Sequence, residues 1–295
     1  MLKSTLVPLS LKEPEEKLED MAGFISHFGT ETVYLLHVFS GSEKEQACRE
    51  SALKDRAALF RDRGMSTETE IRSGTIAGEI CKTAAEREVA YITILWKKKN
   101  IIRRTILSSP DTDLLRICSY STLIFKYREQ DRIREWGRDK DGSDKNGISR
   151  DKKDKTGSGT GDTSQPGTIV YATDCKRADK KVLPYLKSVP FGAEKLYLLH
   201  VRERAPDPES DRKRKVELSD KLEELAEQCL DNYENIEKVV LTGSVRRRIA
   251  GETRARNAEL LVIGRNDKVR PMDKVLGSTA ESLPHQTHCS VLIIA

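Results

Sequence analysis

The stretch that decides the fold is the last one, residues 259–295, ELLVIGRNDKVRPMDKVLGSTAESLPHQTHCSVLIIA. It contains two short apolar runs, residues 260–263, which stop at Gly264, and residues 291–294. Between them, a segment of helix length is expected to start at Gly277. Short apolar runs separated by a helix are typical of neighbouring strands in a parallel sheet. The ligand site of such a sheet lies at the carboxyl ends of its strands, where Gly264 and Gly277 are expected to lie.

The rest of the chain repeats this pattern. Residues 27–38, HFGTETVYLLHV, match residues 190–201, PFGAEKLYLLHV, and their histidines, His37 and His200, are 163 positions apart (200 − 37). Further along, Gly74 matches Gly243 at an offset of 169 (243 − 74). The second copy therefore holds a six-residue insertion (169 − 163) around its long helix. A fixed offset over this length indicates one domain that was duplicated.

Each copy is predicted to be α/β, with a doubly wound, five-stranded parallel sheet, because short apolar strands alternate with helical stretches. The strands are expected at residues 5–10, 33–38, 69–73, 90–95 and 121–126, and at residues 168–173, 195–201, 237–242, 259–263 and 290–294. The long helix of the second copy shows a buried stripe at steps of three or four residues. That stripe consists of Leu218, Leu222, Leu225, Cys229 and Tyr233.

The two copies are separated by a segment of different composition. Residues 128–167 alternate charged residues with Gly and Ser and end in GSGTGDTSQPG, so they lack the apolar area that a folded core requires. We therefore predict a first domain at residues 1–127, a flexible charged linker at residues 128–167, and a second domain at residues 168–295.

Composition excludes several classes of protein. At 295 residues, 34% of them charged, the chain has room for two domains and no apolar run long enough to cross a membrane. The amino terminus shows no signal peptide, and the six cysteines form no CxxC pair, which favours reduced thiols and a cytoplasmic location. The net charge of +5 comes from 52 basic and 47 acidic residues, a mixed surface on which we expect no nucleic-acid binding.

The loop of the last stretch carries a resemblance. The spacing from Gly264 to Asp267 and then to Gly277 and Ser278 resembles the G-x2-G-x9-G-[ST] nucleotide loop of the universal stress protein family, with Asp267 at the second glycine. The resemblance implies two Rossmann-like domains of the adenine nucleotide alpha hydrolase type. It also implies that their last strands pair in an intrachain pseudo-dimer, and we expect the chain to form a homodimer in addition.

The resemblance also implies an adenine nucleotide, ATP or AMP, in the second domain. In the family, the end of the first strand contacts the adenosine, the backbone after the second strand contacts adenine, and the glycine loop holds the phosphates. A glycine admits a phosphate close to the backbone, and the next helix offers free N–H groups. The implied binding residues are Ala172, Thr173, Asp174, Val201, Gly264, Arg265, Asp267, Gly277, Ser278 and Thr279.

Three of these positions have other readings. Asp174 is equally well placed to cap the helical segment that starts at Lys176, and Ser278 with Glu281 forms a capping box.

Asp267 raises a different difficulty, because its carboxylate is negatively charged. At about 6 Å and an effective dielectric of about 20, Asp267 would repel each phosphate charge by roughly 2–3 kcal/mol, about a hundredfold in affinity. Either a divalent metal such as Mg²⁺ bridging the carboxylate to the phosphates, or AMP with its shorter tail, would relieve this repulsion.

The first copy is predicted to bind no nucleotide, because its matching positions are changed. Leu11 stands for Asp174, Leu95 for Gly264, Ser108 for Gly277, and Ser109-Pro110-Asp111 for Ser278-Thr279-Ala280. Proline at the start of a helix removes an N–H group that would face a phosphate, and aspartate adds a negative charge there.

The sequence shows no nucleophile with a base and no metal-ligand set, so we do not expect an enzyme. The leading hypothesis is a stress-response regulatory protein that binds an adenine nucleotide in its second domain and signals by occupancy. The alternative is a structural interaction module that has lost ligand binding in both copies and acts through its dimer surface. The sequence does not identify a protein partner.

Overall fold

The computed structural model describes residues 2–39, 46–96, 119–127, 167–188, 193–202, 207–265 and 278–295. The first half contains β1 (Ser4–Pro8), α1 (Glu15–Ser26), β2 (Thr32–Phe39), α2 (Gln46–Arg61), β3 (Ser66–Ser73), α3 (Ile76–Glu86), β4 (Tyr91–Leu95) and β5 (Ser121–Phe125). The second half contains β6 (Thr168–Thr173), α6 (Arg177–Ser188), β7 (Lys195–Arg202), α7 (Pro208–Glu227), β8 (Asn235–Thr242), α8 (Val245–Ala255), β9 (Leu260–Gly264), α9 (Ser278–Gln286) and β10 (Ser290–Ile294).

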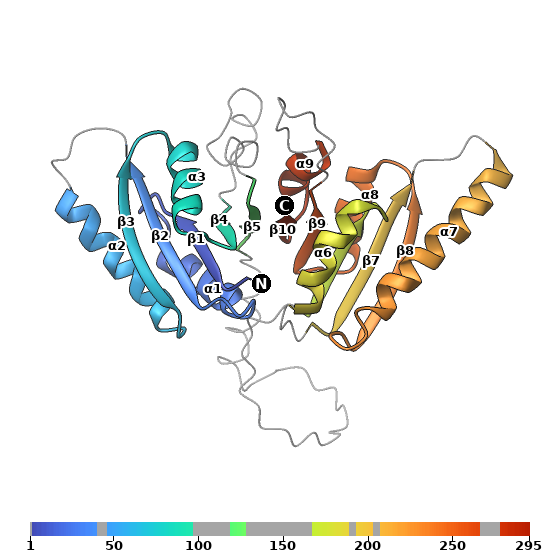
Figure 1. Ribbon diagram of the computed structural model, residues 1–295, viewed down its shortest axis with the longest axis horizontal. Helices are drawn as coiled ribbons and strands as arrows, with labels where there is room; N and C mark the ends of the chain where they lie inside the picture. The colour runs from blue at the N-terminus through green and yellow to red at the C-terminus, as the bar shows by residue number, and fades with distance from the viewer. Residues whose placement is uncertain are drawn as a thin grey trace, which may run out of the picture.

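All ten of these strands belong to one continuous sheet, in the order β3-β2-β1-β4-β5-β10-β9-β6-β7-β8. Within each half the paired strands are parallel, and the order reverses at β1 and at β6, which makes each half doubly wound. Figure 1 shows the two halves side by side, with β5 and β10 next to each other at the centre. The predicted fold, two five-stranded parallel sheets arranged as an intrachain pseudo-dimer, is confirmed.

The two halves are joined by the antiparallel pair β5 and β10, in which Leu123 lies opposite Leu292. Both strands are fully buried along their length. Each would otherwise be an apolar edge open to uncontrolled pairing. The pairing inside the chain covers both edges, so β3 and β8 form the outer edges of the sheet.

The hydrophobic core also crosses this junction. On one face of the sheet, side chains of α1 and α2 and those of α6 and α7 belong to a single buried cluster, which includes Leu18, Phe60, Leu186, Leu222 and Leu292. On the other face the core is divided, with α3 over the first half and α8 and α9 over the second. Burial of apolar area in this shared cluster therefore holds the halves together, in addition to the strand pairing.

The strand predictions hold, with small differences at the ends. The predicted strands 168–173 and 290–294 coincide with β6 and β10. Prediction fails most at β3, which begins at Ser66 rather than residue 69. This strand lies at the edge of the sheet and reads STETEIRS, so its first residues carry little of the apolar signal on which the prediction depends. Residues 128–166 lie outside the described ranges, so the linker and the domain boundaries stay predictions.

The registers confirm the insertion in the second copy. Thr32 pairs with Ser66 and Lys195 with Asn235, so the offset between the halves rises from 163 (195 − 32) to 169 (235 − 66) across the second helix. One expectation on the cysteines is wrong: Cys48, Cys175, Cys229 and Cys289 are free thiols, but Cys81 is disulfide-bonded. Spacing along the chain does not reveal which cysteines meet in space. In the described parts of the chain, no helix is both long and apolar enough to span a bilayer.

Candidate functional site

A cavity of about 700 Å³ opens at the carboxyl ends of β6, β7 and β9. This is the place where the strand order reverses in the second half, since β6 pairs with β7 on one side and with β9 on the other. Doubly wound sheets bind their ligands at such a reversal, because the loops diverge there and leave a crevice. Among the residues that line it are Ala172, Thr173, Asp174, Val201, Gly264 and Thr279.

The remaining predicted site residues are placed as follows. Arg265 follows β9, and its backbone N–H donates a 2.7 Å hydrogen bond to the carbonyl oxygen of Ile294. Ser278 is the first residue of α9, which confirms that a helix restarts there, but its side chain and the capping box it would form stay predictions. Asp267 and Gly277 lie outside the described ranges. The glycine loop is thus only partly described.

Asp174 has the capping role that the sequence analysis gave as the alternative to ligand binding. Its Oδ1 accepts a 3.0 Å hydrogen bond from the backbone N–H of Lys176, immediately before α6 begins at Arg177. A side chain that accepts a hydrogen bond two residues on forms an Asx-turn. The same residue lines the cavity, so the two roles are compatible.

A buried polar cluster supports the floor of the cavity. Thr173 Oγ1 and the Tyr171 hydroxyl both donate to Oδ1 of Asp179, and Thr173 Oγ1 accepts a 2.7 Å hydrogen bond from the N–H of Cys175. Burial raises the pKa of the Asp179 carboxyl, while the two hydrogen bonds act in the opposite direction. Burial and the neighbouring Asp179 also raise the pKa of Tyr171. The cluster fixes the turn from β6 to α6, which carries Asp174.

His200 lies two residues before the end of β7, the strand next to β6, and contributes to the same floor. Its Nδ1 lies 2.9 Å from the carbonyl oxygen of Thr173 and, because a carbonyl oxygen only accepts, Nδ1 carries the proton. Burial lowers the pKa of His200. In the first half, His37 Nδ1 makes the matching 2.9 Å contact with Leu9. The two histidines therefore make the same backbone contact in both halves and contribute to the fold.

These matching contacts correct one residue of the alignment between the halves. Pro8 pairs with Leu36 and Ala172 with Leu199, so β1 and β6 correspond at an offset of 164 (172 − 8). Ser10 therefore stands at the position of Asp174, and Leu11 at that of Cys175. Leu11 and Cys175 share a left-handed backbone, with φ of 64° and 53°. The first half holds one more residue between its first two strands, which a comparison of short strands does not reveal.

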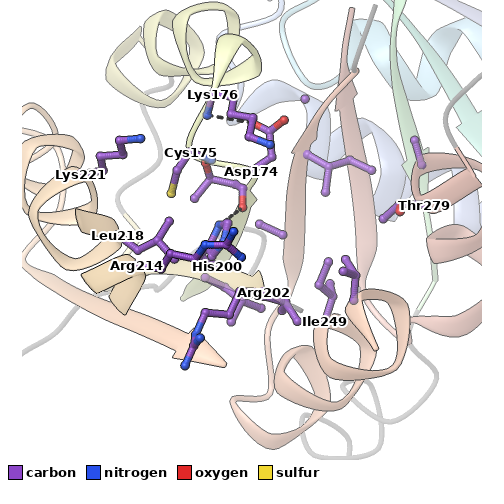
Figure 2. Close-up of a pocket in the computed structure, with 18 of the residues that line it drawn as sticks. Asp174, Cys175, Lys176, His200, Arg202, Arg214, Leu218, Lys221, Ile249 and Thr279 are labelled. Atoms are coloured by element: carbon purple, nitrogen blue, oxygen red, sulfur yellow. Dashed lines mark hydrogen bonds between the residues drawn. The ribbon is translucent and has the colours of Figure 1, made fainter. Parts of the chain in front are cut away.

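The walls of the cavity differ in character, as Figure 2 shows. Arg214 and Lys221 of α7 lie on one side, and Ile249 of α8 and Thr279 of α9 on the other. The side of α8 and α9 is apolar; it includes Val245, Ile249, Ile263 and Ala280. Lys176 follows β6 and, like Arg214 and Lys221, is exposed to solvent. An apolar wall thus faces a basic one.

Sequence reasoning missed the basic wall, although a signal for it exists. Leu218 belongs to the predicted buried stripe, and Arg214 and Lys221 lie four residues before it and three after it, on the same face of the helix. The apolar wall from α8 was also missed, because Val245 and Ile249 lie in a run that is dominated by arginines.

A thiol and an imidazole, those of Cys175 and His200, line the cavity. Burial raises the pKa of the Cys175 thiol to about 11, so it stays protonated at neutral pH and is a poor nucleophile. The proton on His200 Nδ1 is held by a backbone carbonyl. Within the described ranges, no group of three or more His, Cys, Asp and Glu side chains is arranged to hold a metal ion.

Fold and site together define a tandem α/β protein with a cavity at the switch point of its second half. The model of the universal stress protein family matches residues 1–126 and 167–295. The chain belongs to this family, as a member with two domains in tandem.

Solved structures agree with this assignment at the level of the fold. A universal stress protein from Archaeoglobus fulgidus DSM 4304 is 18% identical, with 99% of this chain and 95% of that chain covered and a TM-score of 0.69. A protein from Pseudomonas aeruginosa UCBPP-PA14, described as belonging to the same family, is 16% identical over 99% of this chain and 93% of that chain, with a TM-score of 0.64. Among curated proteins, none matches the chain.

One shorter neighbour was solved with a ligand. It is a universal stress protein from Archaeoglobus fulgidus in complex with dAMP, 18% identical over 41% of this chain and 97% of that chain, with a TM-score of 0.33. Some members of the family therefore bind AMP-type nucleotides. A likeness of this size supports no conclusion about the cavity of the present chain.

Proposed function

We propose that the second half of this protein binds an adenine nucleotide, ATP or AMP, and acts as a regulatory protein that signals by occupancy. One observation carries the proposal: the cavity of about 700 Å³ at the switch point, in which an apolar wall faces a basic one. This volume lies in the range of about 300–1,000 Å³ that small-molecule sites occupy. The purine of a nucleotide stacks against apolar side chains, while the phosphates of the nucleotide bind cationic side chains.

The proposal includes no turnover. The cavity offers a protonated thiol at Cys175 and a histidine whose Nδ1 proton is held by the backbone. Nucleophilic catalysis requires an activated nucleophile within reach of a base. A partner would instead recognise the occupied form of the cavity. If the phosphates lie at the glycine loop, a divalent metal such as Mg²⁺ would bridge them to Asp267.

The second candidate is an interaction module without a ligand. It is favoured by the first half, where the side chain of Leu95, only 7% exposed, occupies the strand position that Gly264 holds in the second. In the first half, an apolar side chain therefore fills the position that borders the cavity in the second half. Under this second hypothesis, the protein acts through its pseudo-dimer surface, and homodimerisation enlarges that surface. Light scattering of the intact protein measures the oligomeric state on which this depends.

The experiment that separates the two is calorimetric titration with ATP, AMP and adenosine. Gly264→Val should abolish binding by filling the cavity, and it should fold, because Gly264 does not have a positive φ. The matched control is Gly251→Val in α8, where an added Cβ meets nothing within 4 Å. Binding that survives Gly264→Val would place the ligand elsewhere. Absence of binding in the unmodified protein would favour the interaction module.

A further inference from the structure

The basic wall of the cavity consists of Lys176, Arg214 and Lys221. None of these three side chains forms an ion pair with any residue that the structure describes. The neighbouring Arg202 differs, because its guanidinium is engaged by the carboxylate of Asp211. The three cations are therefore available to a ligand, whereas the charge of Arg202 is already balanced.

The two α7 cations of this wall are specific to the second half of the molecule, whereas Lys176 has a lysine counterpart, Lys12, at the offset of 164 (176 − 12). Counted from the buried pair Leu53 and Leu222, at an offset of 169 (222 − 53), the position of Lys221 is taken by Ala52 in the first half. Helix α2 begins at Gln46, which corresponds to Lys215. Arg214 thus lies in the part of α7 that precedes any helical residue of α2. The six-residue insertion lengthens the helix, and Arg214 in the added part lines the cavity.

Opposing charges lie near the wall, and one of them, Asp207 at the N-terminus of α7, interacts electrostatically with Arg214. Asp174 lines the cavity, but its Oδ1 accepts the hydrogen bond from Lys176 N–H. Glu217 also lines it and lies between the two α7 cations, three residues after Arg214 and four before Lys221. At this spacing the three side chains share one helix face. The wall keeps a net positive charge, which Glu217 reduces.

We propose that the phosphates of the bound nucleotide lie against α7 and the turn from β6 to α6, held by Lys176, Arg214 and Lys221. The base then lies against the apolar wall of α8 and α9, on the opposite side of the cavity. This inference rests on the proposed function of the cavity. It differs from the arrangement implied by the glycine loop, because the charge that binds the phosphates comes from α7.

The experiment compares ATP with adenosine, since the two ligands share the base and differ in the phosphates. In calorimetric titrations, the double variant Arg214→Ala/Lys221→Ala should weaken ATP binding on the order of tenfold and leave adenosine binding unchanged. The matched control is Arg212→Ala/Lys215→Ala, which removes the same charges from exposed positions of α7 that do not line the cavity. The control should change both affinities by less than about twofold.

A second variant tests the sign of the effect without removing a cation. Glu217→Gln should strengthen ATP binding severalfold, because it removes the negative charge between Arg214 and Lys221, and it should not affect adenosine. If the unmodified protein binds ATP and the α7 double variant binds it equally well, or no worse than the control does, the phosphates lie elsewhere and only the proposed function survives. If the unmodified protein binds neither ligand, both proposals are wrong.

Discussion

Arg202 at the end of β7 donates two hydrogen bonds to the carboxylate of Asp211 in the first turn of α7, one of them 2.7 Å between Nη2 and Oδ2. The Arg202 side chain is only 13% exposed, so the pair is partly withdrawn from water. Bidentate pairs of this kind fix geometry as well as charge. The pair holds the first turn of α7 against the sheet and thereby sets the position of Arg214, three residues further along.

The first prediction concerns this pair. Asp211→Asn should lower the free energy of unfolding by about 1–3 kcal/mol, because it leaves a partly buried guanidinium with a weaker acceptor. It should also weaken ATP binding more than adenosine binding, because α7 carries the basic wall. Urea unfolding and calorimetric titration measure the two effects.

The same helix offers a control for that prediction. Glu209 and Lys213 form an exposed pair at spacing i,i+4, with side chains 83% and 74% exposed. Glu209→Gln should change the unfolding free energy by no more than about 0.5 kcal/mol. Equal effects of Asp211→Asn and Glu209→Gln would mean that the Arg202 pair has no special role.

The second prediction concerns the glycine loop. If the phosphates lie against α7, Asp267→Gly should change the ATP affinity by less than about threefold, because the loop that carries Asp267 is then not what binds them. If the phosphates lie at the loop instead, removal of the charge should strengthen ATP binding up to about a hundredfold. Titration of the variant with ATP, and with adenosine as the reference ligand, distinguishes the two arrangements.

The third prediction concerns the junction between the halves. Proteolytic cleavage within residues 128–166 should leave the two halves associated at micromolar concentration, since β5 pairs with β10 and the buried cluster continues across them. Light scattering of the cleaved protein should give the mass of the intact chain. Separation into two species of half that mass would show that the covalent connection maintains the pairing.

The fourth prediction concerns Lys126, which follows β5 at the same junction. Its Nζ donates a 2.6 Å hydrogen bond to the carbonyl oxygen of Thr287, and burial lowers its pKa to about 8 from an ordinary value of 10.5. Between these two pH values the unfolded chain binds more protons than the folded one, so stability rises with pH in this window. The rise is about 3 kcal/mol at most, and solvent screening reduces it.

Lys126→Met should remove this rise. The difference in unfolding free energy between the unmodified protein and the variant should therefore shift in favour of the unmodified protein as the pH increases from 8 to 10.5. Urea unfolding across this range measures the difference. Lys213→Met, at a side chain that is 74% exposed, serves as the control and should give a constant difference. Parallel curves for Lys126→Met would contradict the proposed cause.

Much of the candidate site could be anticipated from the sequence, and the missing part has a physical explanation. The apolar run before Gly264 placed that residue at a strand end, and the resemblance to universal stress proteins implied Thr173 and Val201. Parallel strands bring all three positions to one edge of the sheet. Arg214 and Lys221 were not found, because many charges on α7 look alike in sequence. Only the packing of the helix against the sheet selects those that face the cavity.

The sequence by itself determined the duplicated α/β fold, the strand positions and the insertion around α7, because burial leaves a periodic pattern and duplication leaves a fixed offset. The tertiary structure alone decided that Ser10, not Leu11, corresponds to Asp174, that Cys81 is disulfide-bonded, and that a single core extends over both halves. These features depend on which segments meet in space. Local periodicity records whether a side chain is buried, and not which neighbours it is buried against.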